Sequence, residues 1–327
     1  MIFIVTKEGI ASSVAVAMGS RLSIAPLFSL PSLALAAPGD TQIAVSTPAA
    51  PQIVGVCLVV AASVFLTSVY LLPRWLLRFV EWNSHPSVLW SVRTSSRVCS
   101  LTIDDAPSSA TPAILDILRE NGVKATFFII SGHIPGNEEV LRRIVREGHS
   151  LANHLTEDRA SILDELHVFE QKLQECDRAI SAFQPAVNEE PPTPEPLETQ
   201  QLLLEEKGPE AVPPVAEVSK EDIAPVKGKW MRPASGWFTT PMREIVARHG
   251  YRICLGSVYP HDAQIRSEIM NSMHLRARTS CGSVIIVHDR SWTVGVLRTA
   301  LPELTRKFTF VNLDELVACN ELKTADK

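Results

Sequence analysis

Residues 98–130 read VCSLTIDDAPSSATPAILDILRENGVKATFFII and carry the clearest signal of the fold. The runs VCSLTI and ATFFII have the length and composition of buried strands, and TPAILDILRENG between them has helical spacing and ends at a glycine. Two strands joined by a helix predict parallel pairing through a right-handed crossover. Because similar alternation continues along the chain, we expect an α/β fold with about six such units, arranged as a closed or nearly closed barrel.

The composition limits the classes of function. The 327 residues are 46% hydrophobic and carry a net charge of −5, which suits a sizeable globular core. Without a basic stripe, there is no electrostatic reason to expect nucleic acid as a partner. The six cysteines are scattered without a CxxC pair, which argues against a zinc ribbon or disulfide framework and favours unpaired buried thiols. One or two disulfides remain an open alternative.

Ionisable residues lie at or after the ends of five of the predicted strands. They are Asp104 with Asp105, His154, Arg232, Asp262 and His288. In βα barrels the working groups collect at the carboxyl ends of the strands, since the loops there line one mouth. We therefore expect these residues to share an active site. The alternative is that the aspartates cap helices, which explains a histidine poorly.

The adjacent carboxylates Asp104 and Asp105 suit two different roles. Side chains alternate along a strand, so the two cannot point the same way. One could bind a metal while the other acts as a base, or the pair could cap the helix that begins at Thr111. Taken alone, a buried histidine such as His288 is more often structural than catalytic. Arg232 by itself does not indicate a function.

Five motifs, TIDDAPS, GHSLANH, MRPASGWF, SVYPHDA and VIIVHD, together resemble the motif series of the polysaccharide deacetylases. This is carbohydrate esterase family four, whose NodB-like domain includes the chitin deacetylases. The resemblance spans residues 98–317 in the same order. It implies a distorted (β/α) barrel of the NodB-like type and a hydrolase that removes N-acetyl groups from amino-sugar polymers such as chitin-like glycans, with the N-acetylated glycan as partner.

The resemblance also implies a role for each strand-end residue. The catalytic residues would be Asp104 as base, Arg232 orienting it, His288 as general acid and Asp262 tuning that histidine. Asp105 and His154 would bind a divalent metal ion. Zinc is the expected ion, and cobalt and manganese are the alternatives.

The second motif departs from the family pattern because Asp158 stands where a second histidine is usual. A carboxylate is a competent zinc ligand, so we expect Asp158 to be the third metal ligand. A spacing of four places it on the same face as His154 if the segment is helical. Two carboxylates and one histidine would tolerate manganese better than a histidine pair does. Alternatively, Asp158 pairs with Arg159 or caps a helix that begins near Ser161.

A membrane anchor is expected before the catalytic region. Residues 53–72, IVGVCLVVAASVFLTSVYLL, contain no charge and have the length that crosses a bilayer. They predict a single-pass transmembrane helix at 53–73 and a membrane protein, with a buried soluble helix as the alternative. Arg74 and Arg78 favour a cytoplasmic C-terminal side, while more distant basic residues pull the other way, so the side of the catalytic domain stays open.

The remaining segments complete the expected organisation. Residues 1–52 form an N-terminal segment that could include a signal or targeting sequence. Residues 74–96 are expected to be a juxtamembrane linker, and residues 97–320 the deacetylase domain. A proline- and glutamate-rich insertion at 185–228 interrupts this domain and is expected to be an extended or disordered loop.

Three functions are consistent with the sequence. The leading hypothesis is a membrane-anchored, metal-dependent glycan N-deacetylase. A catalytically silent glycan-binding module that keeps the barrel is the second. The third is an amidohydrolase that acts on a lipid-linked sugar, which a cytoplasmic catalytic domain would favour.

Overall fold

The computed structural model describes residues 50–71, 73–184 and 228–320. The proposed targeting sequence and nearly all of the acidic insertion lie outside these residues. The chain divides into two compact units, residues 1–83 and residues 84–327. Each unit is described separately.

The first unit contains two described helices, α1 (Ala50–Leu71) and α2 (Arg74–Asn83). Residues 53–71 of the apolar run expected at 53–73 lie within α1, so this part is helical as expected. However, none of the helices in the described part of the chain qualifies as long and apolar enough for a membrane span. The transmembrane part of the expected architecture therefore has no support from the structure.

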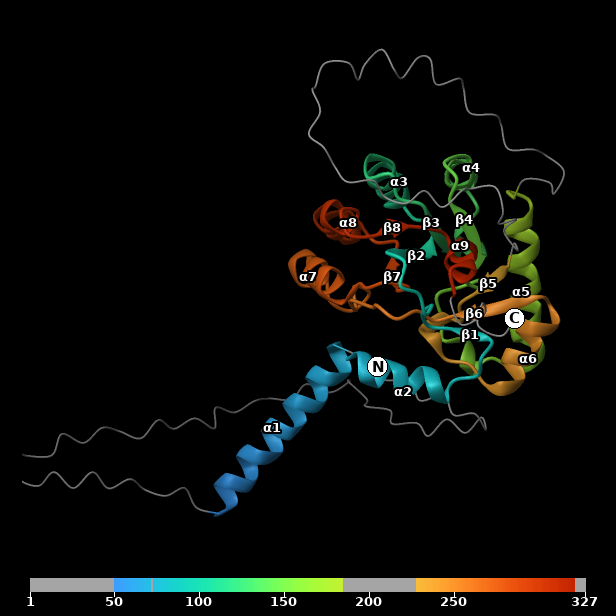
Figure 1. Cartoon of the computed structure of the whole chain (residues 1–327). Coiled ribbons are helices and arrows are strands. Elements are labelled where there is room, and N and C mark those ends of the chain that lie inside the picture. The colour runs from blue at the N-terminus through green and yellow to red at the C-terminus, as the bar shows by residue number, and fades with distance from the viewer. Residues whose placement is uncertain (1–49, 72, 185–227, 321–327) are drawn as a thin grey trace, which may run out of the picture. The chain divides into compact units, whose positions relative to one another are not determined.

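The second unit is built on an eight-stranded parallel sheet with the order β1-β6-β5-β4-β3-β2-β7, and β8 pairs with β2 (Figure 1). The strands are β1 (Val88–Leu89), β2 (Val98–Ala106), β3 (Ala125–Ile129), β4 (Ser150–Asn153), β5 (Lys229–Met231), β6 (Tyr251–Cys254), β7 (Val284–His288) and β8 (Thr309–Phe310). All of their pairings are parallel. Helical crossovers between the strands produce this pattern.

The two ends of the sheet approach each other. Beyond β6, the Val258 N–H donates to the Val284 carbonyl at 3.1 Å, and the Ile286 N–H donates to the Val258 carbonyl at 2.8 Å. An isolated antiparallel bridge also joins Ser91 to Ser283. The predicted α/β fold is thus confirmed as a curled parallel sheet.

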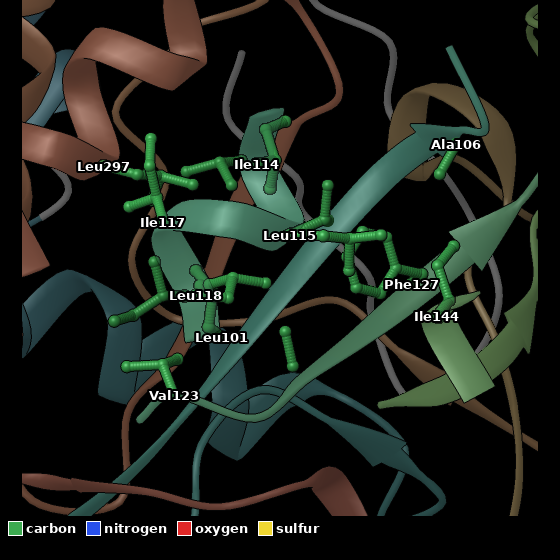
Figure 2. Close-up of a cluster of buried hydrophobic side chains, with 14 of the residues drawn as sticks. Leu101, Ala106, Ile114, Leu115, Ile117, Leu118, Val123, Phe127, Ile144 and Leu297 are labelled. Carbon is green, nitrogen blue, oxygen red and sulfur yellow. The ribbon is translucent and has the colours of Figure 1, made fainter. Parts of the chain in front are cut away.

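Helices surround this sheet. They are α3 (Thr111–Glu120), α4 (Glu138–Arg146), α5 (Leu166–Ser181), α6 (Thr240–Arg248), α7 (Glu268–Arg278), α8 (Ser291–Leu304) and α9 (Leu313–Ala318). In the main core, Leu115 and Leu118 of α3 lie with Leu101 of β2 and Phe127 of β3, and all four side chains are almost fully buried (Figure 2). Each contributes about 1.5–3 kcal/mol through burial of apolar surface.

Three boundaries differ from the sequence expectation. Residues 84–96, which were assigned to a linker, belong to the second unit, because β1 pairs with β6. Strand β2 continues through both aspartates to Ala106. The helix expected to begin near Ser161 begins as α5 at Leu166, since Ser161–Leu163 form a separate 3-10 turn.

Candidate active site

The six residues expected at the strand ends gather at one edge of the curled sheet. Asp104 and Asp105 lie near the end of β2, and His288 ends β7. His154 and Arg232 directly follow β4 and β5, while Asp262 lies in the loop after β6. The carboxyl ends of parallel strands share one edge, so strand order alone brings these residues close together. The contacts among them divide into three groups.

The first group is a buried ion pair between Asp104 and Arg232. Arg232 Nη1 donates to Asp104 Oδ1 and, at 2.9 Å, to the hydroxyl of Thr102, while Nε donates to the Cys254 carbonyl at 2.8 Å. The guanidinium carbon also lies 4.1 Å from the centre of the Phe128 ring. Both charged side chains are about 4% exposed. These contacts hold the guanidinium, and with it the Asp104 carboxylate, in one orientation.

The second group joins His154 to Asp105. His154 Nδ1 lies 2.7 Å from the Arg232 carbonyl, which can only accept, so Nδ1 carries a hydrogen. Its Nε2 faces Asp105 Oδ1 at 3.3 Å. This tautomer leaves Nε2 as the lone-pair nitrogen of the neutral ring, as a metal-ligating histidine requires.

The pKa values of this pair reflect their burial and mutual attraction. Burial lowers the pKa of His154, but the hydrogen bond to Asp105 and the charges of both aspartates outweigh it and raise that pKa overall. Burial raises the pKa of Asp105, yet the hydrogen bond and charge of His154, with His288 and Arg290, hold it well below the usual range. Asp105 is therefore a carboxylate that requires cations around it.

Asp158 approaches this group through an arginine. Arg290 Nη2 donates to Asp105 Oδ2 at 2.6 Å and to Asp158 Oδ2 at 3.3 Å. Residues 154–160 are not helical, so the condition under which Asp158 would share a helical face with His154 is not met. Arg159 pairs instead with Glu157 and Asp164.

The third group is His288 with Asp262. Asp262 is fully buried and accepts from His288 twice, from ring Nδ1 at 2.9 Å and from the backbone N–H at 2.7 Å. Burial lowers the pKa of His288, but Asp262 and the aspartates of β2 outweigh it and raise the pKa to about 9. The imidazole is therefore protonated at neutral pH, with Nδ1 directed at Asp262.

Backbone strain concentrates at these same positions. Within the described residues, four residues other than glycine have φ between 62° and 65°, namely Asp105, Leu155, Ser235 and His261. Each is a site residue or lies within three positions of one. Such conformations cost on the order of 1–3 kcal/mol each and cluster at functional sites, which supports a functional reading of this edge.

The structure adds two residues to which the sequence analysis gave no role, although Asp289 is the last residue of the motif VIIVHD. Arg290 contacts Asp105 and Asp158, and its only sequence signal is an excess of carboxylates over cations at the strand ends. Asp289 is buried and accepts from the hydroxyls of Ser108, at 2.9 Å, and Thr111. It thereby ties the end of β7 to the loop that follows β2.

The side chains fit a metal ion in their chemistry. Within the described residues, no three His, Cys, Asp or Glu side chains lie close enough together to hold one. Asp105 and His154 meet, and Arg290 Nη2 lies within hydrogen-bonding distance of both Asp105 and Asp158. In this arrangement the Arg290 guanidinium is the cation that contacts both carboxylates. An imidazole nitrogen with two carboxylates is a donor set that divalent ions accept.

Comparisons with known proteins agree with this geometry. The polysaccharide deacetylase family model matches residues 91–193. The chain is 23% identical over 244 residues to a peptidoglycan-N-acetylglucosamine deacetylase of Bacillus cereus, which covers 70% of this chain and 92% of the relative. It is also 36% identical over 88 residues to a chitooligosaccharide deacetylase of Rhizobium leguminosarum, which covers 27% of this chain and 41% of the relative.

Among solved structures, the fold is similar to that of a CE4 family pseudoenzyme from Bacillus anthracis. The TM-score is 0.55 at 19% identity, and the match covers 73% of this chain and 71% of the other. At 19% sequence identity, this similarity shows a shared fold and nothing about function.

Proposed function

Because this chain carries a polysaccharide deacetylase domain, we propose that it is a hydrolase that removes N-acetyl groups from an amino-sugar glycan. The observation that carries the proposal is the meeting of a buried Asp104–Arg232 pair, an Asp105–His154 pair and a protonated His288 at one edge of the sheet. Amide hydrolysis needs a base, a group that stabilises negative charge and an acid for the leaving amine.

Asp104 is the candidate base. Arg232 holds its carboxylate in place and leaves Asp104 to accept a proton from the attacking water. Because Thr102, Cys254 and Phe128 fix the guanidinium, the Asp104 orientation does not depend on substrate. Orientation of this kind lowers the entropic part of the barrier.

His288 is the candidate acid. Its pKa of about 9 keeps the ring protonated at neutral pH, and its Nδ1 is engaged by Asp262. The other ring nitrogen, Nε2, therefore holds the proton that is available to the departing amine. The products would be acetate and a free amino sugar.

Asp105, His154 and Asp158 are the candidate ligands of a divalent ion, with zinc expected first. When bound, such an ion supplies Lewis acidity toward the acetamide oxygen and a water molecule. Asp105 and His154 are buried and already face each other. Asp158 would complete the set if its carboxylate exchanged Arg290 for the ion.

The substrate class follows from the relatives' names. One is named for peptidoglycan N-acetylglucosamine and the other for chitooligosaccharide, so both names denote amino-sugar glycans. We infer that this chain acts on that class, with chitin-like oligomers as the first substrate to test. Peptidoglycan contains the same N-acetylated amino sugar and is the second substrate to test.

A catalytically silent glycan-binding module is the second candidate. The position of Arg290 between Asp105 and Asp158 favours it, since a guanidinium there opposes a metal ion. The fold does not discriminate, because the matching structure from Bacillus anthracis is described as a pseudoenzyme.

Acetate release decides between the two candidates. The full chain would be incubated with chitin oligomers, and in parallel with peptidoglycan, in the presence of zinc, cobalt or manganese. Asp104→Asn serves as the inactive control. Release by the wild-type chain but not by Asp104→Asn supports the deacetylase. No release with any ion, together with retained oligomer binding, would establish the silent module.

A further inference from the structure

One guanidinium joins the two carboxylates that are candidate metal ligands. Arg290 Nη2 lies 2.6 Å from Asp105 Oδ2 and 3.3 Å from Asp158 Oδ2. The other oxygen of Asp105 faces His154 Nε2 at 3.3 Å. Arg290 thus bridges two of the three candidate ligands, Asp105 and Asp158. We propose that Arg290 is an internal competitor of the metal, which holds the ligands when the ion is absent and must leave before it binds.

The charge balance of the site explains why a cation is needed there. Arg232 pairs with Asp104, and His288 pairs with Asp262. Asp105, whose side chain is only 4% exposed, is left with His154 at 3.3 Å and Arg290 at 2.6 Å as its partners. A buried carboxylate without a cation is strongly unfavourable, so Arg290 stabilises the metal-free chain. The planar guanidinium of an arginine, with several N–H donors, suits a contact with two carboxylates better than the ammonium group of a lysine would.

The backbone at Arg290 is fixed, while its side chain is partly open to solvent. The Asp289 N–H donates to the Asp104 carbonyl at 2.8 Å, and the Asp289 carboxylate accepts from Ser108 and Thr111. The Arg290 side chain is 28% exposed. The guanidinium can therefore swing outward about its own side-chain bonds without disturbing the end of β7. Displacement then costs the two carboxylate contacts and the hydrogen bond that Arg290 Nη1 donates to the Asp289 carbonyl at 3.3 Å.

Asp158 is held near Arg290 by the loop that carries it. Asp164 accepts from Lys172 of α5 at 2.9 Å and also pairs with Arg159, while Lys172 contacts Glu157 at 2.6 Å. These ion pairs flank Asp158 on both sides in the sequence. Asp158 is 59% exposed, so its carboxylate has room to turn from Arg290 to an ion. The Asp158 carboxylate can thus bind either the Arg290 guanidinium or a metal ion.

The inference deepens the proposed function, on whose metal site it rests. It predicts that wild-type affinity for a divalent ion is limited by Arg290 rather than by the donor atoms. Charge-assisted hydrogen bonds of this type correspond to roughly tenfold or more in an equilibrium constant. Arg290→Gln should therefore bind zinc and cobalt at least about tenfold more tightly than the wild-type chain.

The test measures dissociation constants for zinc and cobalt on the full chain, by competition with a chromophoric chelator. The variants are Arg290→Gln and Arg290→Lys, which keeps the charge without the planar guanidinium and should bind with intermediate affinity. Arg276→Gln is the matched control, because Arg276 also pairs with a carboxylate, that of Glu303, at 33% exposure. It should bind as the wild type does.

A second readout is the temperature of unfolding, measured without and with metal. In the presence of a chelator, Arg290→Gln should unfold at a lower temperature than the wild-type chain, and added zinc should raise its unfolding temperature by more than it raises that of the wild type. If Arg290→Gln does not fold, Arg290→Lys decides the question. Equal metal affinity in Arg290→Lys and the wild type would then overturn the inference.

The outcomes separate this inference from the proposed function. Equal affinity in the wild type and Arg290→Gln overturns the inference and leaves the deacetylase proposal standing. Tighter binding by Arg290→Gln without acetate release supports the inference and contradicts the deacetylase proposal. Absence of metal binding in every variant overturns both the metal site and the inference.

Discussion

Asp262 receives two hydrogen bonds from His288, one from ring Nδ1 at 2.9 Å and one from the backbone N–H at 2.7 Å. The carboxylate is itself fully buried, and Thr293 donates to it at 3.3 Å. The proton on His288 therefore depends on a neighbour that is closed off from solvent. Asp262 acts as a positioning residue for a candidate acid.

Deacetylase activity should be lost at alkaline pH as His288 loses its proton. Burial alone would lower the pKa of His288, but Asp262 and the β2 aspartates raise it to about 9. A group with a raised pKa keeps its proton below that value, so kcat/KM should be maintained toward pH 8 and fall above about 9. Acetate release measured from pH 6 to 11 checks this fall in activity, which is the alkaline limb of the pH profile.

Asp262→Asn is the matched variant for this profile. It removes the charge that raises the pKa of His288, so the alkaline limb should move to lower pH by about 1 unit or more. A purely structural role for Asp262 would lower activity at every pH and leave the limb in place.

Asp104→Asn should reduce activity strongly and also reduce stability. Loss of a positioned base corresponds to about 10²–10⁴ in rate. The substitution also leaves the Arg232 guanidinium buried without its partner, which costs about 3–5 kcal/mol. Acetate release and urea unfolding measure the two effects. Asp116→Asn, at a carboxylate that is 47% exposed and pairs with Arg119 and Arg143, should change both quantities far less.

The gathering of polar residues at one edge could be predicted because it depends only on strand order. Parallel strands place their carboxyl ends together, so Asp104, His154 and Arg232 meet even though as many as 128 positions separate them. The residues that form the strands also have a clear apolar pattern. For these reasons the fold class and the strand-end residues followed from the sequence.

The Arg290 contact could not be predicted in this way. It joins side chains separated by 185 and 132 positions, and it depends on the path of two loops rather than on strand order. Strand β1 was missed for a related reason, since two residues paired with β6 give no periodic signal. Loop paths and two-residue strands are set by tertiary contacts.

The free energy of unfolding should fall between pH 7 and pH 5 because of His149. Its Nδ1 accepts from the Ala125 N–H at 3.1 Å, and burial lowers its pKa to about 4. The unfolded chain binds this proton near pH 6.5, so the stabilisation is present above pH 6.5 and is lost as the pH falls toward 4. The loss from this one group is about 2 kcal/mol.

Urea unfolding at the two pH values measures this effect. His149→Asn keeps an acceptor and should remove about 2 kcal/mol of the pH dependence. His167→Asn is the control, because His167 is exposed and should leave the dependence unchanged. An unaltered dependence in His149→Asn would contradict the assignment. His274, whose pKa burial also lowers to about 4, should account for part of the remainder.

Gly282 should tolerate no side chain, because it lies where the two ends of the curled sheet approach each other. This residue precedes β7 with φ of 72°, and a Cβ there would lie 1.8 Å from the Val92 carbonyl oxygen. Two hydrogen bonds hold the approach, from Gly282 N–H to the Val98 carbonyl at 2.8 Å and from Val92 N–H to the Gly282 carbonyl at 2.9 Å. The backbone cannot yield without breaking one of them.

Gly122→Ala provides the matched comparison, since Gly122 has φ of 64° and a Cβ there would meet nothing within 4 Å. It should cost about 1–2 kcal/mol, the conformational penalty alone. Gly282→Ala adds the clash to the same penalty, so its midpoint of urea unfolding should fall well below that of Gly122→Ala. Equal midpoints for the two variants would mean that Val92 moves freely, and that the bridge between Ser91 and Ser283 does not close the sheet firmly.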